Sequence, residues 1–177
     1  QFGQKEAPVL TSRESNLIVW AIRREIKFFD SVFRPTDARL REWVLLRSML
    51  ATGQLQDQEL HVALCFCMLY VDDAGGASMD DELSYPGGGR MYGAWHSGFA
   101  CYVPCDAGSA GATPMRRPDA HYAIALAVVV AFGHGAALGK GQAPSLRMDL
   151  LGVDIDVGRY RRQVPAEKCK AYGSAAR

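Results

Sequence analysis

The spacing of apolar residues predicts two amphipathic helices early in the chain. The first covers residues 12–29 and carries basic residues away from its apolar stripe. Pro35 interrupts the pattern, and Thr36 can cap a second helix that runs to about residue 52. Residues 1–10 are expected to form a loop or turn. The two apolar stripes consist of Ile18, Ile22, Ile26 and Phe29, and of Leu40, Trp43, Leu46 and Leu50.

An uncharged run follows these helices and ends in two adjacent carboxylates. The run covers residues 60–71 and predicts a buried strand. Asp72 and Asp73 repel each other unless a cation lies between them, and carboxylate oxygen is the ligand that Mg²⁺ prefers. The small residues at 74–78 are expected to let the chain reverse tightly. The pattern therefore predicts an acidic hairpin tip that can hold magnesium.

In the second half of the chain, a Gly- and Pro-rich segment is followed by a predicted helix and a predicted strand. Residues 79–119 are rich in Gly and Pro and show no sustained period, so we expect a long irregular insertion. A helix is predicted at 122–132 and ends at Gly133. Residues 150–156 alternate in their second half and predict a strand.

One segment requires a comparison with membrane helices. Residues 120–139 contain no Asp, Glu, Lys or Arg, and the segment is about as long as a spanning helix. His121, His134 and several glycines interrupt it, so its apolar part is limited to 122–132. We favour a core helix in which the two histidines form structural hydrogen bonds, and the membrane span remains the alternative.

Composition indicates one folded domain but no particular partner. The chain has 177 residues, of which 49% are hydrophobic and 22% are charged, and its net charge is +1. That charge gives no support for a nucleic-acid partner. Basic residues are nevertheless concentrated near the C-terminus, where they either meet phosphate or are solvated. They are Arg159, Arg161, Arg162, Lys168, Lys170 and Arg177.

The cysteines favour a reducing, intracellular compartment. There are five, an odd number, and two of them lie in the apolar run. No secretory signal is visible, and the first residue is Gln1 rather than Met, so we expect a fragment or a processed product. His96, Cys101 and Cys105 could suggest zinc, but they provide too few ligands at poor spacing.

Several motifs occur in the order in which reverse transcriptases carry them. Residues 2–9 resemble the Phe-Gly-x-x-x-Ala-Pro loop, and residues 70–73 resemble the Tyr-x-Asp-Asp box. Later segments resemble the next polymerase motif, the Leu-Gly turn that closes the palm, and the entry to the thumb. The most similar members are retrotransposons of the DIRS type. These later segments contain Gly133, Gly135 and Lys140, Leu150, Leu151 and Gly152, and Val164 to Lys168.

The resemblance implies an α+β fold, with an antiparallel palm-like sheet backed by helices. It covers most of the chain except residues 30–58 and 79–119. Residues 1–157 would be an incomplete polymerase palm, with the irregular insertion at 79–119. The basic tail at 158–177 would begin the thumb.

The resemblance also implies RNA-directed DNA polymerase chemistry on a primer-template and a dNTP. Two Mg²⁺ ions would bridge carboxylates and the triphosphate. Asp72 would be a metal ligand, Asp73 a second or supporting one, and Lys140 the proton donor to pyrophosphate. Residues near the primer, the nucleotide and the template would be Phe2, Gly3, Gln4, Tyr70 and Val71.

Departures from the family leave other functions open. The family needs a further catalytic Asp upstream of the Phe-Gly loop, so this chain alone is expected to be inactive. Asp154 and Asp156 follow the Leu-Gly turn and are expected to be strand-face residues. The first alternative is a non-catalytic structural subunit of a larger, possibly membrane-associated, complex. Another is a nucleic-acid-binding remnant that uses the basic tail, and no Ser/His/Asp nucleophile set is recognisable.

Overall fold

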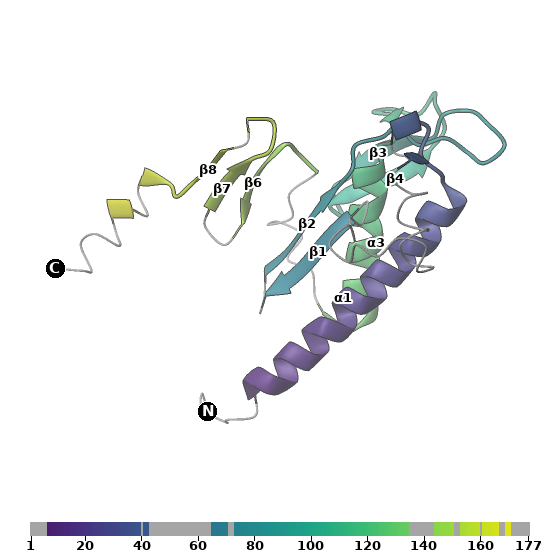
Figure 1. Cartoon of the computed structure of the whole chain (residues 1–177). Helices are drawn as coiled ribbons and strands as arrows, with labels where there is room; N and C mark the ends of the chain where they lie inside the picture. The colour runs from purple at the N-terminus through teal and green to yellow at the C-terminus, as the bar shows by residue number, and fades with distance from the viewer. Residues whose placement is uncertain are drawn as a thin grey trace. The chain divides into compact units, whose positions relative to one another are not determined.

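The computed structural model describes residues 7–39, 41–42, 65–70, 73–134, 144–150, 153–159, 161–166 and 169–170 (Figure 1). The fold is α+β, with helices and antiparallel sheets, as predicted. The chain divides into two compact units, Gln1–Gly141 and Gln142–Arg177.

Helix α1 spans Ala7–Val32 and includes the helix predicted at 12–29. The expectation of a loop is wrong for residues 7–10, because a proline in the first turn of a helix needs no intrahelical hydrogen-bond donor. The helix ends at Val32, three residues beyond the predicted end and before Pro35, which was predicted to interrupt it. Phe33 N donates to Phe29 O at 2.8 Å, and Pro35 is buried. Of the second predicted helix, residues 38–39 and 41–42 are helical, and the rest lies outside the described residues.

Helix α3 spans Arg117–Ala131 and confirms the helix predicted at 122–132. A proline lies in its first turn, and Gly133 follows it with a φ of 82°, a left-handed conformation that favours glycine. Among the described residues, no helix is long and apolar enough to cross a membrane.

The two helices pack against each other through the predicted apolar stripe. Ile18, Ile22 and Ile26 are 1%, 2% and 5% exposed. They contact one face of α3, formed by Ile124, Ala125, Val128 and Val129. Burial of these side chains removes apolar surface from water and so stabilises the packing of the two helices.

Strands β1 (Cys65–Tyr70) and β2 (Asp73–Ser78) form an antiparallel hairpin. β1 contacts α1, and β2 contacts α3. The small residues at 74–78 lie within β2, so the expectation that they form the reversal is wrong. Small residues are common in turns, but here the ladder from Tyr70↔Asp73 to Cys65↔Ser78 holds them in an extended strand.

Residues 79–119 contain a second sheet, so the expectation of an irregular segment is wrong. β3 (Tyr92–His96) lies between β4 (Cys101–Cys105) and β5 (Thr113–Pro114), and all the pairings are antiparallel. Each strand is too short to show a period, and the turns before and between the strands contain Gly88, Gly89 and Gly111 with positive φ. A second apolar cluster lies here and consists of Leu83, Met91, Met115 and Ala120.

The second unit contains a three-stranded antiparallel sheet. Its strands are β6 (Arg147–Leu150), β7 (Val153–Asp156) and β8 (Arg161–Gln163), in that order. The single strand predicted at 150–156 is therefore the end of β6 and the whole of β7. Asp154 and Asp156 lie on β7, which confirms their assignment to a strand.

Candidate functional site

The acidic hairpin is the site predicted from the sequence, and its two strands are present. The register pairs Tyr70 with Asp73, which leaves residues 71–72 as the connection. Two-residue connections are the commonest in β-hairpins. Val71 and Asp72 lie outside the described residues, whereas Asp73 is the first residue of β2.

The remaining predicted site residues are not tested by the structure. Phe2, Gly3, Gln4 and Lys140 lie outside the described residues, as does Asp72. Within the part that is described, no group of three or more His, Cys, Asp or Glu residues could hold a metal ion. The magnesium site at Asp72 and Asp73 therefore stays a prediction.

The same finding bears on the zinc alternative, whose three residues are all described. His96 pairs with Cys101 across β3 and β4, whereas Cys105 pairs with Tyr92 at the other end of these strands. The His96 ring stacks on Phe99, with ring centroids 4.5 Å apart. Burial raises the pKa of the Cys101 thiol, which disfavours the thiolate that zinc requires. These residues form no metal site.

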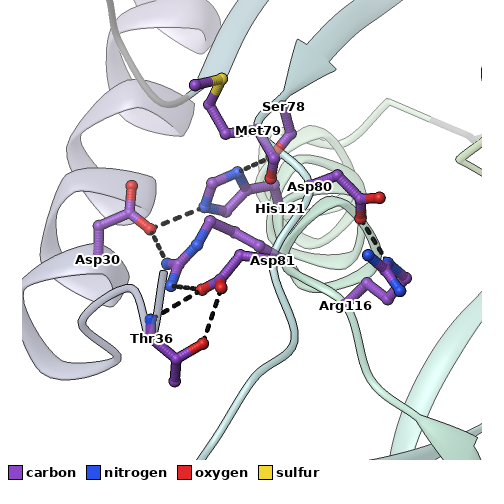
Figure 2. Close-up of polar contacts among 9 residues, drawn as sticks. Asp30, Thr36, Ser78, Met79, Asp80, Asp81, Arg116 and His121 are labelled. Carbon is purple, nitrogen blue, oxygen red and sulfur yellow. Dashed lines mark hydrogen bonds and ion pairs between the residues drawn. The ribbon is translucent and has the colours of Figure 1, made fainter. Parts of the chain in front are cut away.

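A buried polar network lies at the opposite end of β2 from the acidic tip (Figure 2). Its centre is Arg117, the first residue of α3, whose side chain is 0% exposed. Arg117 Nη1 lies 2.6 Å from Asp30 Oδ1, and Nη2 lies 3.0 Å from Asp81 Oδ2. The backbone N of Arg117 also donates to Asp81 O at 2.8 Å. One guanidinium thus joins the end of α1, the start of α3 and the segment that follows β2.

His121 extends this network to the hairpin. Its Nε2 lies 3.0 Å from Asp30 Oδ1, and its Nδ1 lies 2.8 Å from Ser78 Oγ. The ring is 2% exposed and packs edge-on against Phe29, with centroids 5.8 Å apart. The predicted structural role of His121 is confirmed. His134 also has a partner, because its Nε2 lies 3.1 Å from Glu14 Oε1.

Thr36 belongs to the network rather than to a helix cap. Its Oγ1 donates to Asp81 Oδ1 at 2.9 Å, and its backbone N lies 3.3 Å from Asp81 Oδ2. The side-chain oxygen that was expected to cap the second helix is therefore engaged with a residue 45 positions away. Asp81 receives donors from both Thr36 and Arg117, so its buried carboxylate is well satisfied.

The electrostatics explain why Arg117 and Asp81 can be buried, with Asp30 half-buried beside them. Two carboxylates, Asp30 and Asp81, share the guanidinium of Arg117, and charged groups are buried only when they are paired and hydrogen-bonded. The Nε atom of Arg117 is buried and has no hydrogen-bond partner. Such a network stabilises little relative to an apolar core, but the loss of one member leaves an uncompensated buried charge.

Ser78, His121 and Asp30 are connected in the order of a serine nucleophile, its base and an orienting acid. Two observations oppose nucleophilic chemistry. Arg117 occupies the same Asp30 oxygen, which weakens the support that the carboxylate gives to an imidazolium. The buried ring also lacks access to a bound substrate. The arrangement instead holds Ser78 in place.

Sequence reasoning missed this network because its members are distant in the chain. The separations are 36 residues for Arg117 and Asp81, 43 for Ser78 and His121, and 91 for Asp30 and His121. The Arg-Pro-Asp start of α3 suggests a helix N-terminus, but nothing in the sequence pairs it with Asp30.

In the second unit, Asp154 accepts two hydrogen bonds from Arg147, through Nε at 3.0 Å and through Nη2. The Arg147 guanidinium holds the pKa of the Asp154 carboxyl below its usual value. Asp156 accepts from the Arg159 backbone N at 2.9 Å. Both carboxylates therefore have partners within the unit.

Comparison of the chain with families of known proteins, with curated proteins and with solved structures finds no match. Function is accordingly inferred from the hairpin and from the residues that hold it.

Proposed function

We propose that the chain is part of the palm of a retroelement reverse transcriptase and contributes metal-binding carboxylates to template-directed nucleotide addition. The observation that carries this proposal is the hairpin register, in which Tyr70 pairs with Asp73. The Tyr-x-Asp-Asp box thus spans the end of one strand and the start of the next. Metal-ion catalysis of phosphoryl transfer needs such anions at a fixed place beside the reacting phosphates.

The packing around the hairpin supports the same proposal. Its two strands contact different helices, α1 behind β1 and α3 behind β2, and these helices share one apolar core. A sheet that is backed by helices gives a metal site a rigid support. Phosphoryl transfer depends mainly on positioning and on charge neutralisation, so this support matters for the reaction.

In this proposal each residue has a defined part. Asp72 binds Mg²⁺, and Asp73 is a second or supporting ligand. Lys140 donates a proton to the leaving pyrophosphate, where a cation also stabilises negative charge. The residues that contact the primer end, the nucleotide and the template are Phe2, Gly3, Gln4, Tyr70 and Val71. When bound, Mg²⁺ lowers the pKa of the primer hydroxyl and neutralises the phosphates.

Primer extension tests the proposal. The chain is fused to the upstream fingers and palm segment of an active reverse transcriptase, which supplies the further catalytic Asp. Asp72→Asn is expected to lower the rate of extension by about 10²- to 10³-fold, because it removes a charge that binds the metal. The matched control is Asp106→Asn, which removes a charge from an exposed turn in the same unit.

The outcomes separate the proposed functions. Equal rates for Asp72→Asn and Asp106→Asn would remove the assignment of Asp72. A fusion that extends no primer, although it folds and binds primer-template, would favour the non-catalytic structural subunit. In that case the apolar side chains exposed on α1, among them Trp20 and Phe28, are candidates for contacts with other subunits.

A further inference from the structure

We infer that Ser78 and His121 are positioning residues for the acidic hairpin: they tie the base of strand β2 to both helices and thereby fix the place of the metal-binding tip. This inference rests on the proposed function for its catalytic consequence. The tie itself follows from the contacts of the described residues.

The hairpin needs such a tie because β2 has little side-chain volume. Its sequence is Asp-Ala-Gly-Gly-Ala-Ser, so between Asp73 and Ser78 the strand carries only methyl groups and hydrogens. Glycine within a strand weakens it, because it has no side chain to pack and loses more backbone entropy on folding. Ladder hydrogen bonds to β1 fix the register but do not fix the hairpin against the helices.

Ser78 adds a polar attachment to these contacts at the end of the strand. It pairs with Cys65 at the base of the hairpin, five residues from Asp73 or about 17 Å at the usual rise of a strand. Its Oγ lies 2.8 Å from His121 Nδ1, and His121 belongs to α3. We expect a displacement at this end to be carried along the paired strands to Asp73.

His121 is itself held firmly. Asp30 can only accept, so the imidazole Nε2 carries a proton and donates to Asp30 Oδ1 at 3.0 Å. Arg117 fixes that carboxylate in turn, at 2.6 Å. The ring therefore connects β2 to the end of α1 as well as to α3.

The contact between Ser78 and His121 persists in both states of the ring. When the imidazole is neutral, Nδ1 accepts a hydrogen bond from the Ser78 hydroxyl. When it is protonated, Nδ1 donates to Ser78 Oγ, and the hydroxyl can donate to Met79 O, which lies 3.3 Å away. A hydroxyl at position 78 can thus hydrogen-bond to His121 Nδ1 in both states, whereas a methyl group can do so in neither.

The test compares three variants in the fusion described above. Ser78→Ala removes the tie, Ser78→Thr keeps a hydroxyl, and Ser31→Ala removes a different serine hydrogen bond, from Oγ to Phe28 O at 2.7 Å on α1. We expect Ser78→Ala to lower kcat by about 10- to 100-fold at unchanged KM, because small misplacements of reacting groups cost this much. Ser78→Thr should recover most of the rate, and Ser31→Ala should leave it unchanged.

Hydrogen exchange of the chain itself gives a second readout that needs no activity. In Ser78→Ala, amides of residues 65–78 should exchange about fivefold faster, the effect of losing one hydrogen bond of about 1 kcal/mol. Ser31→Ala should leave these amides unchanged.

Each outcome decides the inference. If the fusion extends primers and Ser78→Ala matches Ser31→Ala in kcat, the positioning role is overturned. If the unmutated fusion extends no primer, the proposed function fails, and amide hydrogen exchange alone tests whether the contact between Ser78 and His121 holds the hairpin. Equal exchange of residues 65–78 in the two alanine variants would then overturn it, and faster exchange in Ser78→Ala would support it.

Discussion

At the scale of single residues, Arg117 stands at the centre of the polar network in the first unit. It is fully buried, and its two ion pairs neutralise carboxylates on different segments. Its unpaired Nε adds a cost that the other hydrogen bonds must offset. In the described part of the first unit, the guanidinium of Arg117 thus balances the charge of both carboxylates.

Removal of that guanidinium should destabilise the protein strongly. We predict that Arg117→Met lowers the free energy of unfolding by about 3–5 kcal/mol, because Asp81 is then buried, and Asp30 half-buried, without the guanidinium that pairs with both. Urea denaturation monitored by circular dichroism measures the change.

The control is Arg90→Met, which removes an ion pair of an exposed arginine with Glu82, at 3.4 Å. It should change the free energy of unfolding by less than about 1 kcal/mol, since exposed pairs contribute little. Similar losses in the two variants would contradict the role assigned to Arg117.

At the scale of elements, the hairpin of β6 and β7 carries a pH-dependent contact. Arg147 on β6 binds Asp154 on β7, and this contact lowers the pKa of the Asp154 carboxyl. A carboxyl whose pKa is lower in the folded state stabilises that state above its unfolded-state pKa. The stabilisation is lost as the pH falls through the folded-state value.

A carboxyl titration tests this contact. We predict that Arg147→Gln raises the pKa of Asp154 towards its usual value, as followed by the ¹³C chemical shift of its side-chain carboxyl. Arg159→Gln should leave it unchanged, because Arg159 pairs with Asp156. An Asp154 carboxyl that titrates at its usual value in the unmutated chain would refute the prediction.

Elements with local signals could be predicted from the sequence. The stripe of Ile18, Ile22 and Ile26 repeats every four residues, so the periodicity that defined α1 also defined its buried face. The helix predicted at 122–132 and the strand before the acidic pair were found from uninterrupted apolar runs. In these cases the deciding interactions lie within a few residues.

Elements that depend on distant partners could not be predicted. Residues 74–78 have turn composition, and only pairing with β1 makes them a strand. The sheet of β3, β4 and β5 is likewise built from strands too short to show a period. The network around His121 joins side chains up to 91 residues apart, and no local pattern encodes that proximity.

At the scale of the whole molecule, net charge conceals an uneven distribution. The chain has a net charge of +1, but in the second unit Arg161 and Arg162 are exposed on β8. If the chain belongs to a polymerase, these arginines are candidates for binding nucleic-acid phosphates.

Salt dependence measures such binding. We predict that the chain binds single-stranded nucleic acid and that Arg161→Gln with Arg162→Gln reduces the slope of log K against log salt by about 1.4, or about 0.7 for each phosphate that is no longer neutralised. The control removes two charges from α1, through Arg24→Gln with Lys27→Gln, and should not change the slope. Fluorescence anisotropy at several salt concentrations provides the data, and equal slopes in the two double variants would exclude a specific role for β8.

The distance between Asp30 and His121 along the chain also has a consequence for synthesis in the cell. A ribosome adds roughly 5–20 residues per second, so about 5–18 s pass between the emergence of these two partners, 91 residues apart. During that interval α3 is not yet available to cover Ile18, Ile22 and Ile26 of α1, so the nascent chain exposes an apolar surface. A chaperone that binds short apolar segments could therefore bind α1, because this helix is translated well before α3.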